Sequence, residues 1–391
     1  MSRDAARPDA GALQGVRLLD LTDERGVYGA KLLADLGADA VRVEPPGGDP
    51  LRRRGPFVDG TGDSLWYAWF ASNRRSVTVN VASGDGRATL RRLALAADII
   101  MDSGTLAAAA IDEAELLRER PSLVIVRVTA FGASGPWKDL VAPDLVAAAL
   151  GGFAATTGDV DTPPLKGFGE LNFITAGTYA AIGALAALYH ARAGGEGQMV
   201  DAPVHEAIVS CLEHVLMWHW YEGRIGPMQH GKVLPRRGSL HWSDLYQVMK
   251  AIGGSIMITP TPDPEKQLAW LAEEDALEDL LDEQYQGLAN YVRRVDRTMA
   301  VLRDWAAAKD VEQLFLEAQA RHRAYGRVLP VDLVGRNPQL EARRWWVEYR
   351  VGERRVRGTG APYHLSETPW RIDTAGAAGV AVTIADIGWD G

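Results

Sequence analysis

Short apolar runs alternate with amphipathic stretches over the first 130 residues of the chain. Apolar positions spaced three and four residues apart are typical of helices that bury one face, and short β-branched runs are typical of buried strands. Strands that alternate with helices in this way predict a Rossmann-like α/β domain, in which helices cover both faces of a mostly parallel sheet. The predicted strands are 17–22, 40–44, 76–81, 98–102 and 123–129, and the predicted helices are 29–36, 85–96 and 113–119.

The pattern changes after residue 143. A long apolar helical region runs from 144 to about 221, with interruptions near 159–168 and at 193–203, where GGEGQMVDAPV predicts a turn and one more strand. Residues 224–245 have no period and many Gly, Pro and Arg residues, as a linker or an active-site loop would. Residues 264–320 are charged and amphipathic. We therefore expect a large α/β domain at 1–221, a linker at 222–245, a small α+β domain at 246–325, and a C-terminal segment at 326–391 with β-like runs at 327–333 and 345–350.

Composition narrows the class of protein. The 391 residues, 47% hydrophobic and 24% charged, are typical of a folded soluble protein with two or three domains. A net charge of −9 argues against a nucleic-acid partner, because nucleic-acid-binding proteins carry a basic surface. The single cysteine, Cys211, excludes an internal disulfide and any zinc site built on paired cysteines.

The sequence gives no sign of a membrane or secretory segment. Residues 1–15 contain no apolar stretch of the kind found in signal peptides. The longest uncharged run, 173–189, is rich in Ala and Gly and slightly short for a membrane span. We therefore expect a buried helix there, a cytoplasmic location and no membrane partner.

Four common catalytic or nucleotide-binding motifs are absent. The first predicted strand is followed by DERGVYG rather than by G-x-G-x-x-G, which disfavours a nicotinamide enzyme. Neither G-x-x-x-x-G-K-[ST] nor G-x-S-x-G occurs. His205-Glu206 begins like the zinc motif H-E-x-x-H, but Val209 stands where the second histidine is needed. We therefore expect no metal site.

Several longer strings occur in a fixed order, and together they carry a resemblance. They are GAKLLADLGADAVRVEPPGGD at 29–49 with Arg52 after it, Asn73-Arg74-Arg75-Ser76, Phe131-Gly132-x-x-Gly135-Pro136, PDLVAAALGG from Pro143, AGTYAAIGALAALYHARAGGEGQMVD at 176–201, and LPVDLVGRNPQLEARRWWV at 329–347. With these strings the chain resembles the family III CoA-transferases, also called the CaiB/BaiF family. The resemblance covers nearly the whole chain and is weakest at 205–325 and after residue 370.

The resemblance implies an acyl-CoA:carboxylate CoA-transferase. Its substrates would be a coenzyme A thioester and a small carboxylic acid, with no tightly bound cofactor. It also implies an interlocked dimer in which the final segment returns to the first domain. A homodimer is expected, and a heteromer is the alternative.

The resemblance further implies that Asp144 is the covalent nucleophile. A carboxylate can keep the thioester energy by forming a mixed anhydride with the acyl group; CoA thiolate then attacks the aspartyl carbonyl and gives an aspartyl-CoA thioester. Aspartate suits this role because the side chain is normally ionised at neutral pH without the help of a base. From the local sequence alone, Asp144 would instead be interpreted as the N-cap of an Ala-rich helix.

Candidate contacts to the substrate are glycines, cations and one serine. Glycine lets backbone N–H groups approach an oxyanion closely, although a Gly-Gly pair can equally end a helix. Clustered cations suit the phosphates of CoA, although most surface arginines only form surface ion pairs. The glycine candidates are Gly132, Gly135, Gly151 and Gly152; the cation candidates are Lys31, Arg52, Arg74 and Arg75, of which Arg52 matches a family arginine; the serine is Ser103.

The sequence also departs from the family at three places. Asp102-Ser103-Gly104 replaces the usual Glu-Asn-Phe, Phe173 replaces an acidic residue, and AGAAGVAVTIADIGWDG replaces the usual Leu-Gly-Glu-His ending. These departures leave open a non-catalytic or specialised subunit of a heteromeric CoA-transferase. The 2-methylacyl-CoA racemases of the family use a His before the Asp and a second Asp, and here Pro143 and Phe173 occupy those positions. A racemase is therefore disfavoured.

Aromatic residues cluster at 66–70 and 218–221, followed by Trp242 and Tyr246. They could line an apolar acyl pocket. Core or subunit-interface packing is the alternative.

Overall fold

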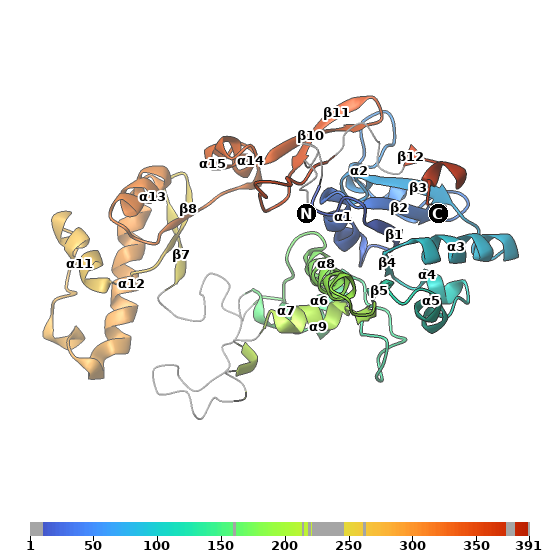
Figure 1. Cartoon of the computed structure of the whole chain (residues 1–391). Coiled ribbons are helices and arrows are strands. Elements are labelled where there is room, and N and C mark those ends of the chain that lie inside the picture. The colour runs from blue at the N-terminus through green and yellow to red at the C-terminus, as the bar shows by residue number, and fades with distance from the viewer. Residues whose placement is uncertain are drawn as a thin grey trace, which may run out of the picture. The chain divides into compact units, whose positions relative to one another are not determined.

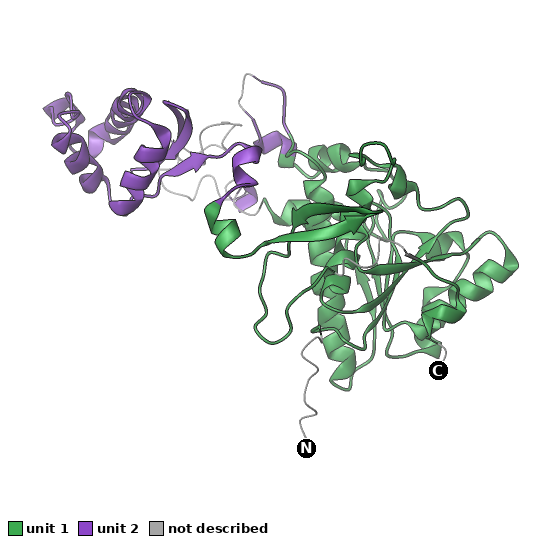
Figure 2. Cartoon of the chain, turned by 90° about the horizontal axis from the view of Figure 1, so that it is seen from above, with its two compact units in different colours: residues 1–153, 166–213, 338–391 green, residues 154–165, 214–337 purple. Residues whose placement is uncertain are grey.

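A computed structural model describes residues 11–158, 162–212, 215–217, 220, 246–260, 263–372 and 380–389. The chain forms two compact units (Figure 2). Unit 1 contains residues 1–153, 166–213 and 338–391, and unit 2 contains residues 154–165 and 214–337. The last part of unit 1 thus begins at residue 338, whereas the sequence placed a boundary at 326. The predicted linker at 222–245 lies outside the described residues.

A seven-stranded parallel sheet forms the centre of unit 1 (Figure 1). The strand order is β12-β3-β2-β1-β4-β5-β6, so the chain changes direction across the sheet between β1 and β4. In sheets of this type ligands bind outside the carboxyl ends of the strands at that switch point. The predicted α/β fold class and its five strands are confirmed. The strands are β1 (Arg17–Leu21), β2 (Asp39–Glu44), β3 (Arg74–Thr78), β4 (Ile99–Asp102), β5 (Val124–Arg127), β6 (Met199–Asp201) and β12 (Val380–Ala381).

Helices cover both faces of this sheet. On one face α1 (Val27–Asp35) and α8 (Leu171–Arg192) bury Leu33 and Ala184 against the strands. On the other face α3 (Gly84–Ala96), α4 (Thr105–Ala108) and α5 (Glu113–Glu119) bury residues such as Leu90 and Leu116. Because the central strands are buried on both sides, they are nearly continuous apolar runs, and this made them recognisable in the sequence.

The segment after residue 379 completes the sheet at its β3 edge. β12 pairs with β3, and the buried Trp389 donates its indole N–H to Asp39 Oδ2 at 2.8 Å. Arg75 forms an ion pair with Asp39 and donates to the carbonyl oxygens of Asp386 and Ile387, both at 3.1 Å. Arg75 was predicted to bind CoA. It lies near the amino end of β3, away from the ligand-binding ends of the strands, and holds the C-terminal segment instead.

α8 is the longest helix among the described residues. By length and composition it is the one described helix that could cross a membrane, but half of its most apolar window is buried inside the protein. Its buried alanines, including Ala176 and Ala180, pack against the sheet. We interpret it as the buried core helix predicted from the sequence. Its neighbours in the chain are α6 (Asp144–Leu150), α7 (Phe153–Thr156) and α9 (Val204–Ser210).

α1 and α8 cross where two glycines meet. A Cβ atom on Gly29 would lie 2.6 Å from the carbonyl oxygen of Gly177, and one on Gly177 would lie 2.8 Å from the backbone nitrogen of Gly29. Real Cβ atoms do not approach backbone atoms this closely. The crossing therefore requires glycine on both helices and fixes the first turns of α8 next to α1.

We expect Gly177→Ala to lower the free energy of unfolding by roughly 1–3 kcal/mol, because the two helices must separate to admit the methyl group. Urea unfolding of the full chain measures this change. Gly84→Ala is the matched control, because a Cβ at the start of α3 meets no atom within 4 Å. Equal stability of the two variants would contradict the proposed tight crossing.

Unit 2 is an α+β unit. Its apolar core includes Trp270, Leu302 and Trp305. The predicted strand at 327–333 is wrong beyond residue 328, because Pro330 has no N–H for a sheet and is instead the N-cap of a short helix. The antiparallel strands are β7 (Gln247–Ala251), β8 (Gly254–Ile258) and β9 (Gly326–Val328), and the helices are α11 (Pro264–Glu273), α12 (Tyr291–Ala307), α13 (Val311–Ala320) and α14 (Val331–Val334).

A hairpin from the last part of unit 1 packs on α2 (Leu65–Phe70). Tyr349 and Val351 of the hairpin join Tyr67 and Phe70 of α2 in one apolar cluster. The remaining elements of the chain are α15 (Pro338–Ala342), the hairpin strands β10 (Trp346–Val351) and β11 (Arg354–Thr359), and the 3₁₀ helices η1 (Pro50–Arg53), η3 (Glu283–Tyr285), η4 (Leu288–Asn290) and η5 (Ala385–Ile387).

Candidate active site

Asp144 is the first residue of α6, and only 7% of its surface is exposed. The N-cap of this helix is Pro143, and the Asp144 side chain accepts no hydrogen bond from α6. The interpretation of Asp144 as the N-cap of its own helix is therefore wrong. The carboxylate points to the beginning of α8 instead, where the first backbone N–H groups of a helix lack partners within the helix.

Four donors surround the Asp144 carboxylate. Oδ1 accepts the backbone N–H groups of Asn172 at 3.1 Å and Phe173 at 3.3 Å. Oδ2 accepts from Lys166 Nζ at 2.9 Å and from the side-chain amide of Asn172, also at 2.9 Å. The positive end of the α8 dipole and the Lys166 ammonium both favour a negative charge here. The side chain is thus held in one orientation with its charge compensated.

Lys166 belongs to the turn that leads into α8. Its ammonium group also donates to the carbonyl oxygens of Gly167 and Gly169, and 24% of its side chain is exposed. Gly169 has φ +75°, a conformation that favours glycine and brings its carbonyl back towards the lysine. Lys166 was not predicted from the sequence. The signal was a lone lysine in the string KGFG just before a long apolar helix.

A second carboxyl group lies within electrostatic range of Asp144. Glu170, the N-cap residue of α8, forms an ion pair with Arg54. Burial raises the pKa of Glu170, and the charges of Asp144 and Glu24 raise it further, while Arg54 opposes the shift. Glu170 Oε2 and Arg54 Nη1 are buried and make no hydrogen bond to the described residues.

The N–H groups of Gly151 and Gly152 do not donate to Asp144. Their N–H groups donate to carbonyl oxygens of the last turn of α6, and Gly152 has φ +82°. They end the helix, about 10 Å along its axis from Asp144 at 1.5 Å per residue. Their predicted role as oxyanion donors is therefore corrected. The N–H groups of Asn172 and Phe173 occupy that position.

Gly132 and Gly135 lie in the loop after β5 with φ +98° and +88°. The N–H of Gly132 already donates to the Thr129 hydroxyl at 2.8 Å. A Cβ on Gly135 would meet no atom within 4 Å, so that backbone faces open space. Neither glycine is bonded to Asp144, and their contact with substrate stays a prediction.

The switch point of the sheet holds Ser103 and Arg25. Ser103 follows β4, and its buried hydroxyl makes no hydrogen bond to the described residues. Arg25, which follows β1, donates to the Ser103 carbonyl oxygen at 3.1 Å. The Asp102 carboxylate accepts the N–H of Gly104 at 2.8 Å, and burial raises the pKa of Asp102. An arginine and a free hydroxyl thus lie where such folds bind ligands, and the arginine was not predicted from the sequence.

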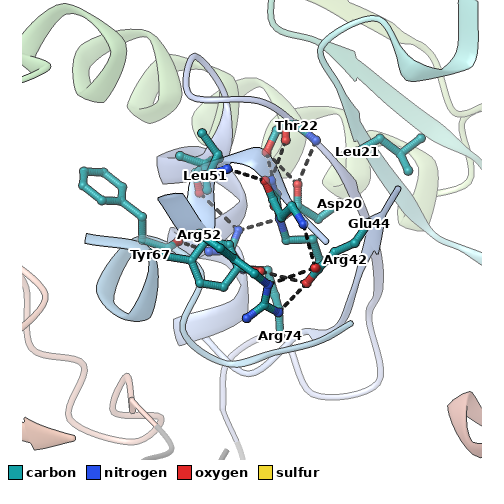
Figure 3. A network of polar contacts seen from close by, with 12 residues as sticks. Asp20, Leu21, Thr22, Arg42, Glu44, Leu51, Arg52, Tyr67 and Arg74 are labelled. Atoms are coloured by element: carbon teal, nitrogen blue, oxygen red, sulfur yellow. Dashed lines mark hydrogen bonds and ion pairs between the residues drawn. The ribbon is translucent and has the colours of Figure 1, made fainter. Parts of the chain in front are cut away.

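Arg74 belongs to a buried network of charges around β1 and β2 (Figure 3). Asp20 Oδ2 accepts from Arg42 Nη1 at 2.8 Å and from Arg74 Nη1 at 2.7 Å, and the side chains of Asp20 and Arg74 are fully buried. Arg74 therefore cannot reach the phosphates of CoA, and its predicted role is corrected. The sequence showed the charge but not its partner 54 residues away.

Lys31 is buried as well. Its ammonium donates to Asp35 Oδ2 and to the Ser72 hydroxyl, both at 2.7 Å, and only 3% of the residue is exposed. Burial lowers the pKa of Lys31 and raises that of Asp35. The prediction that Lys31 binds CoA is therefore also corrected.

Arg52 keeps an accessible side chain. It pairs with Glu44, its guanidinium carbon lies 4.3 Å from the centre of the Tyr67 ring, and 36% of its side chain is exposed (Figure 3). Tyr67 donates its hydroxyl to the same glutamate at 3.0 Å. The guanidinium is thus fixed in direction but still reachable, and its contact with CoA stays a prediction.

Neither Pro143 nor Phe173 offers a base for proton transfer. Pro143 has no titratable group, and Phe173 is 3% exposed within an apolar cluster that includes Ala147 and Ala176. Among the described residues no group of three or more His, Cys, Asp or Glu side chains could hold a metal ion. The aromatic positions at 218–219, 221 and 242 lie outside the described part of the chain, whereas Trp66 and Phe70 stack at 4.2 Å within α2.

A buried carboxylate that is held by fixed donors is suited to attack an acyl group and to carry it covalently. The profile of "CoA-transferase family III" matches residues 13–376, a span that contains Asp144, Lys166 and the start of α8. The chain belongs to CoA-transferase family III. The resemblance found in the sequence is confirmed.

Relatives of this family III CoA-transferase match over most of its length. The BbsE subunit of succinyl-CoA:(R)-benzylsuccinate CoA-transferase from Thauera aromatica is 31% identical over 91% of this chain and 88% of its own. Succinate–glutarate CoA-transferase from Agrobacterium fabrum is 27% identical over 92% of this chain and 91% of its own. Succinyl-CoA–D-citramalate CoA-transferase from Chloroflexus aurantiacus is 34% identical, but the match spans only 57% of this chain and 56% of that protein.

The fold has a close counterpart among solved structures. A CaiB/BaiF family protein from Brucella suis superposes with a TM-score of 0.79 at 25% identity, over 94% of this chain and 96% of that one. The matched part of the chain therefore includes residues of both units.

Proposed function

We propose that this family III CoA-transferase moves CoA from an acyl-CoA donor to a free carboxylic acid through covalent intermediates on Asp144. The observation that carries the proposal is the Asp144 carboxylate itself, buried and held by four donors at the start of α8. Pro143 and Phe173 flank the site without a base, which favours acyl transfer over proton transfer.

In the first half of the proposed reaction, an Asp144 oxygen attacks the thioester carbon of the donor. The carbon–sulfur bond breaks and CoA thiolate leaves, so that a mixed anhydride remains. The thiolate then attacks Cγ of Asp144, which gives an aspartyl-CoA thioester and releases the donor acid. In the second half the same steps occur in reverse: the acceptor carboxylate attacks Cγ and releases CoA thiolate, and the thiolate then attacks the acyl carbon of the new anhydride and releases Asp144.

We propose that CoA lies across the switch point of the sheet. Arg25 and the unpaired hydroxyl of Ser103 are candidates there, and Arg52 is the accessible cation among those chosen from the sequence. The names of several relatives pair succinyl-CoA with a second carboxylic acid. Succinyl-CoA is therefore the first donor to test.

A dimer is proposed from the exposed apolar side chains of unit 1. Leu145 and Leu150 on α6 and Tyr179, Ile182 and Tyr189 on α8 are between 46% and 77% exposed. Several exposed apolar side chains on neighbouring helices are typical of a surface that is covered in the assembled protein.

A cytoplasmic location remains our proposal from the sequence.

We expect light scattering at micromolar concentration to give twice the mass of the chain. Ile182→Glu should shift the mass towards the monomer, because a charge would be buried in the interface. Glu115→Gln, an exposed change on α5, is the control and should leave the mass unchanged. A wild-type monomer would contradict the proposed assembly.

The covalent step is tested with donor acyl-CoA in the absence of acceptor. A CoA-sized adduct should form on the peptide that contains Asp144, and hydroxylamine should convert that residue to a hydroxamate and inactivate the enzyme. If the chain binds succinyl-CoA and other acyl-CoA donors without any adduct, the covalent mechanism is wrong for this chain.

The second candidate function is that of a subunit in a heteromeric CoA-transferase. Two relatives are named as the alpha and beta subunits of succinyl-CoA–L-malate CoA-transferase, and BbsE is itself a subunit. The atypical Asp102-Ser103-Gly104 segment also favours this alternative. Activity that appears only after a homologous chain is added would support it.

A further inference from the structure

The two oxygens of Asp144 lie in different surroundings. Within the described part of the chain, Oδ1 is bonded only to backbone, the N–H groups of Asn172 and Phe173. Oδ2 is bonded there only to side chains, the ammonium of Lys166 and the amide of Asn172. One oxygen is thus bonded to the backbone of α8, and the other to two side chains.

The backbone contacts make Oδ1 the less mobile oxygen. They come from the first turn of α8, a helix of 22 residues that is fixed against α1 by the crossing of Gly29 and Gly177. Lys166, in contrast, lies on a turn, and 24% of its side chain is exposed. A lysine side chain has rotatable bonds along its whole length, so the ammonium can turn towards an oxygen that moves while it keeps its contacts to the Gly167 and Gly169 carbonyl oxygens.

We propose that Oδ2 is the oxygen that attacks the acyl-CoA and later departs with the released acid, that Oδ1 stays on Asp144, and that Lys166 binds the carboxylate of each exchanging acid. This inference rests on the proposed covalent mechanism. It identifies Lys166 as a catalytic residue and a free carboxylate anion as its ligand.

The atoms balance as follows. Oδ2 forms a bond to the acyl carbon of the donor, and the carbon–sulfur bond breaks to give CoA thiolate. The thiolate adds to Cγ, and the negative charge develops on Oδ1, where the N–H groups of Asn172 and Phe173 already point. The Cγ–Oδ2 bond then breaks, and its electron pair leaves on Oδ2 as the carboxylate of the departing acid. No proton is gained or lost.

The negative charge on Oδ2 lies beside Lys166 both before and after the reaction. Before the reaction it belongs to Asp144, and after the reaction it belongs to the released acid, so the ammonium keeps a partner although Asp144 has become neutral. Attack by Oδ1 would instead break two backbone hydrogen bonds of a rigid helix, and the oxyanion would then form away from the backbone N–H groups. The arrangement of donors therefore favours attack by Oδ2 and retention of Oδ1 on Asp144.

The assignment is tested with an acceptor acid that carries oxygen-18 at both carboxylate positions. The wild-type protein turns over donor acyl-CoA with excess labelled acid in ordinary water, and the Asp144 peptide is then examined by mass spectrometry. We expect a single heavy oxygen on Asp144 after many turnovers, because one oxygen exchanges while the other stays on Asp144; the contacts of the two oxygens assign the exchanging one as Oδ2. Two heavy oxygens would overturn the assignment. If CoA transfer proceeds and Asp144 carries no label, the proposed function fails, and this inference fails with it.

Lys166 is tested by chemical rescue. Lys166→Ala should lower turnover by roughly 10²–10³-fold, as the loss of one preorganised donor does elsewhere. Ethylammonium should restore part of this activity, whereas tetramethylammonium at the same ionic strength, which has the charge but no N–H, should not. Lys266→Ala, on the exposed surface of α11, is the control and should match the wild type. Equal effects of the two cations, or wild-type turnover by Lys166→Ala, would overturn the role of Lys166. The labelling experiment needs no variant, so it still shows whether one oxygen of Asp144 or both exchange even if Lys166→Ala does not fold.

Discussion

Asparagine at position 144 is expected to lower turnover by roughly 10⁴-fold or more, because an amide cannot attack the thioester and form the anhydride. The replacement should also cost about 1–3 kcal/mol of stability, since its NH₂ group would face donors at either oxygen position and leave a buried group unsatisfied. Steady-state transfer from succinyl-CoA and urea unfolding measure the two effects.

Asp139→Asn is the matched control for this change. Asp139 lies on the exposed loop just before α6, and its replacement should leave stability and turnover unchanged. Mass spectrometry must exclude slow deamidation of the variant back to aspartate. Near wild-type transfer by intact Asp144→Asn would contradict Asp144 as the nucleophile.

The largest expected effect on stability comes from Asp20. Asp20→Asn leaves Arg42 and Arg74 buried beside a neutral group, and breaking such a buried ion pair typically costs about 3–5 kcal/mol. Chemical unfolding at neutral pH measures the loss. Glu119→Gln removes an exposed ion pair with Arg91 and should change stability by less than about 1 kcal/mol. A similarly small loss for Asp20→Asn would show that the network contributes little.

The effect of Asp20 should depend on pH in a defined direction. Burial alone would raise the pKa of this carboxyl group, but Arg42 and Arg74 together hold it below its ordinary value of 3.8. The folded protein therefore binds the proton less readily than the unfolded chain. The stabilisation is complete above that ordinary value and is lost as the pH falls through the lower folded pKa. The stability difference between wild type and Asp20→Asn should accordingly narrow under acid conditions.

Local patterns were sufficient to predict much of unit 1. β1, β4 and β5 are buried on both faces, so that each is a short apolar run with a polar or helical neighbour. Asp144 was found because its surrounding string resembles a family motif, not because its own neighbours reveal a nucleophile.

The surroundings of Asp144 could not be predicted in the same way. Lys166 and Asn172 lie 22 and 28 residues further along the chain, beyond a segment without a period, and only the fold brings them to the carboxylate. The same limit explains the wrong cation assignments. A positive charge is visible in the sequence, but the sequence does not show that Arg74 is buried and paired with Asp20 on another strand.

The division of unit 1 into separate stretches of chain has a consequence for protein synthesis. When residues 1–213 have left the ribosome, the strand β12 and the side chain of Trp389 do not yet exist, and the roughly 170 residues from position 214 to the end of β12 must be translated first. At about 5–20 residues per second this takes on the order of 8–34 s, during which β3 is an open edge of a nascent sheet. Arg75, the second residue of β3, places positive charge on that edge, and charge discourages pairing with strands of other nascent chains. Arg75 thus discourages pairing at this edge during translation. In the folded protein it binds the C-terminal segment that covers the same edge.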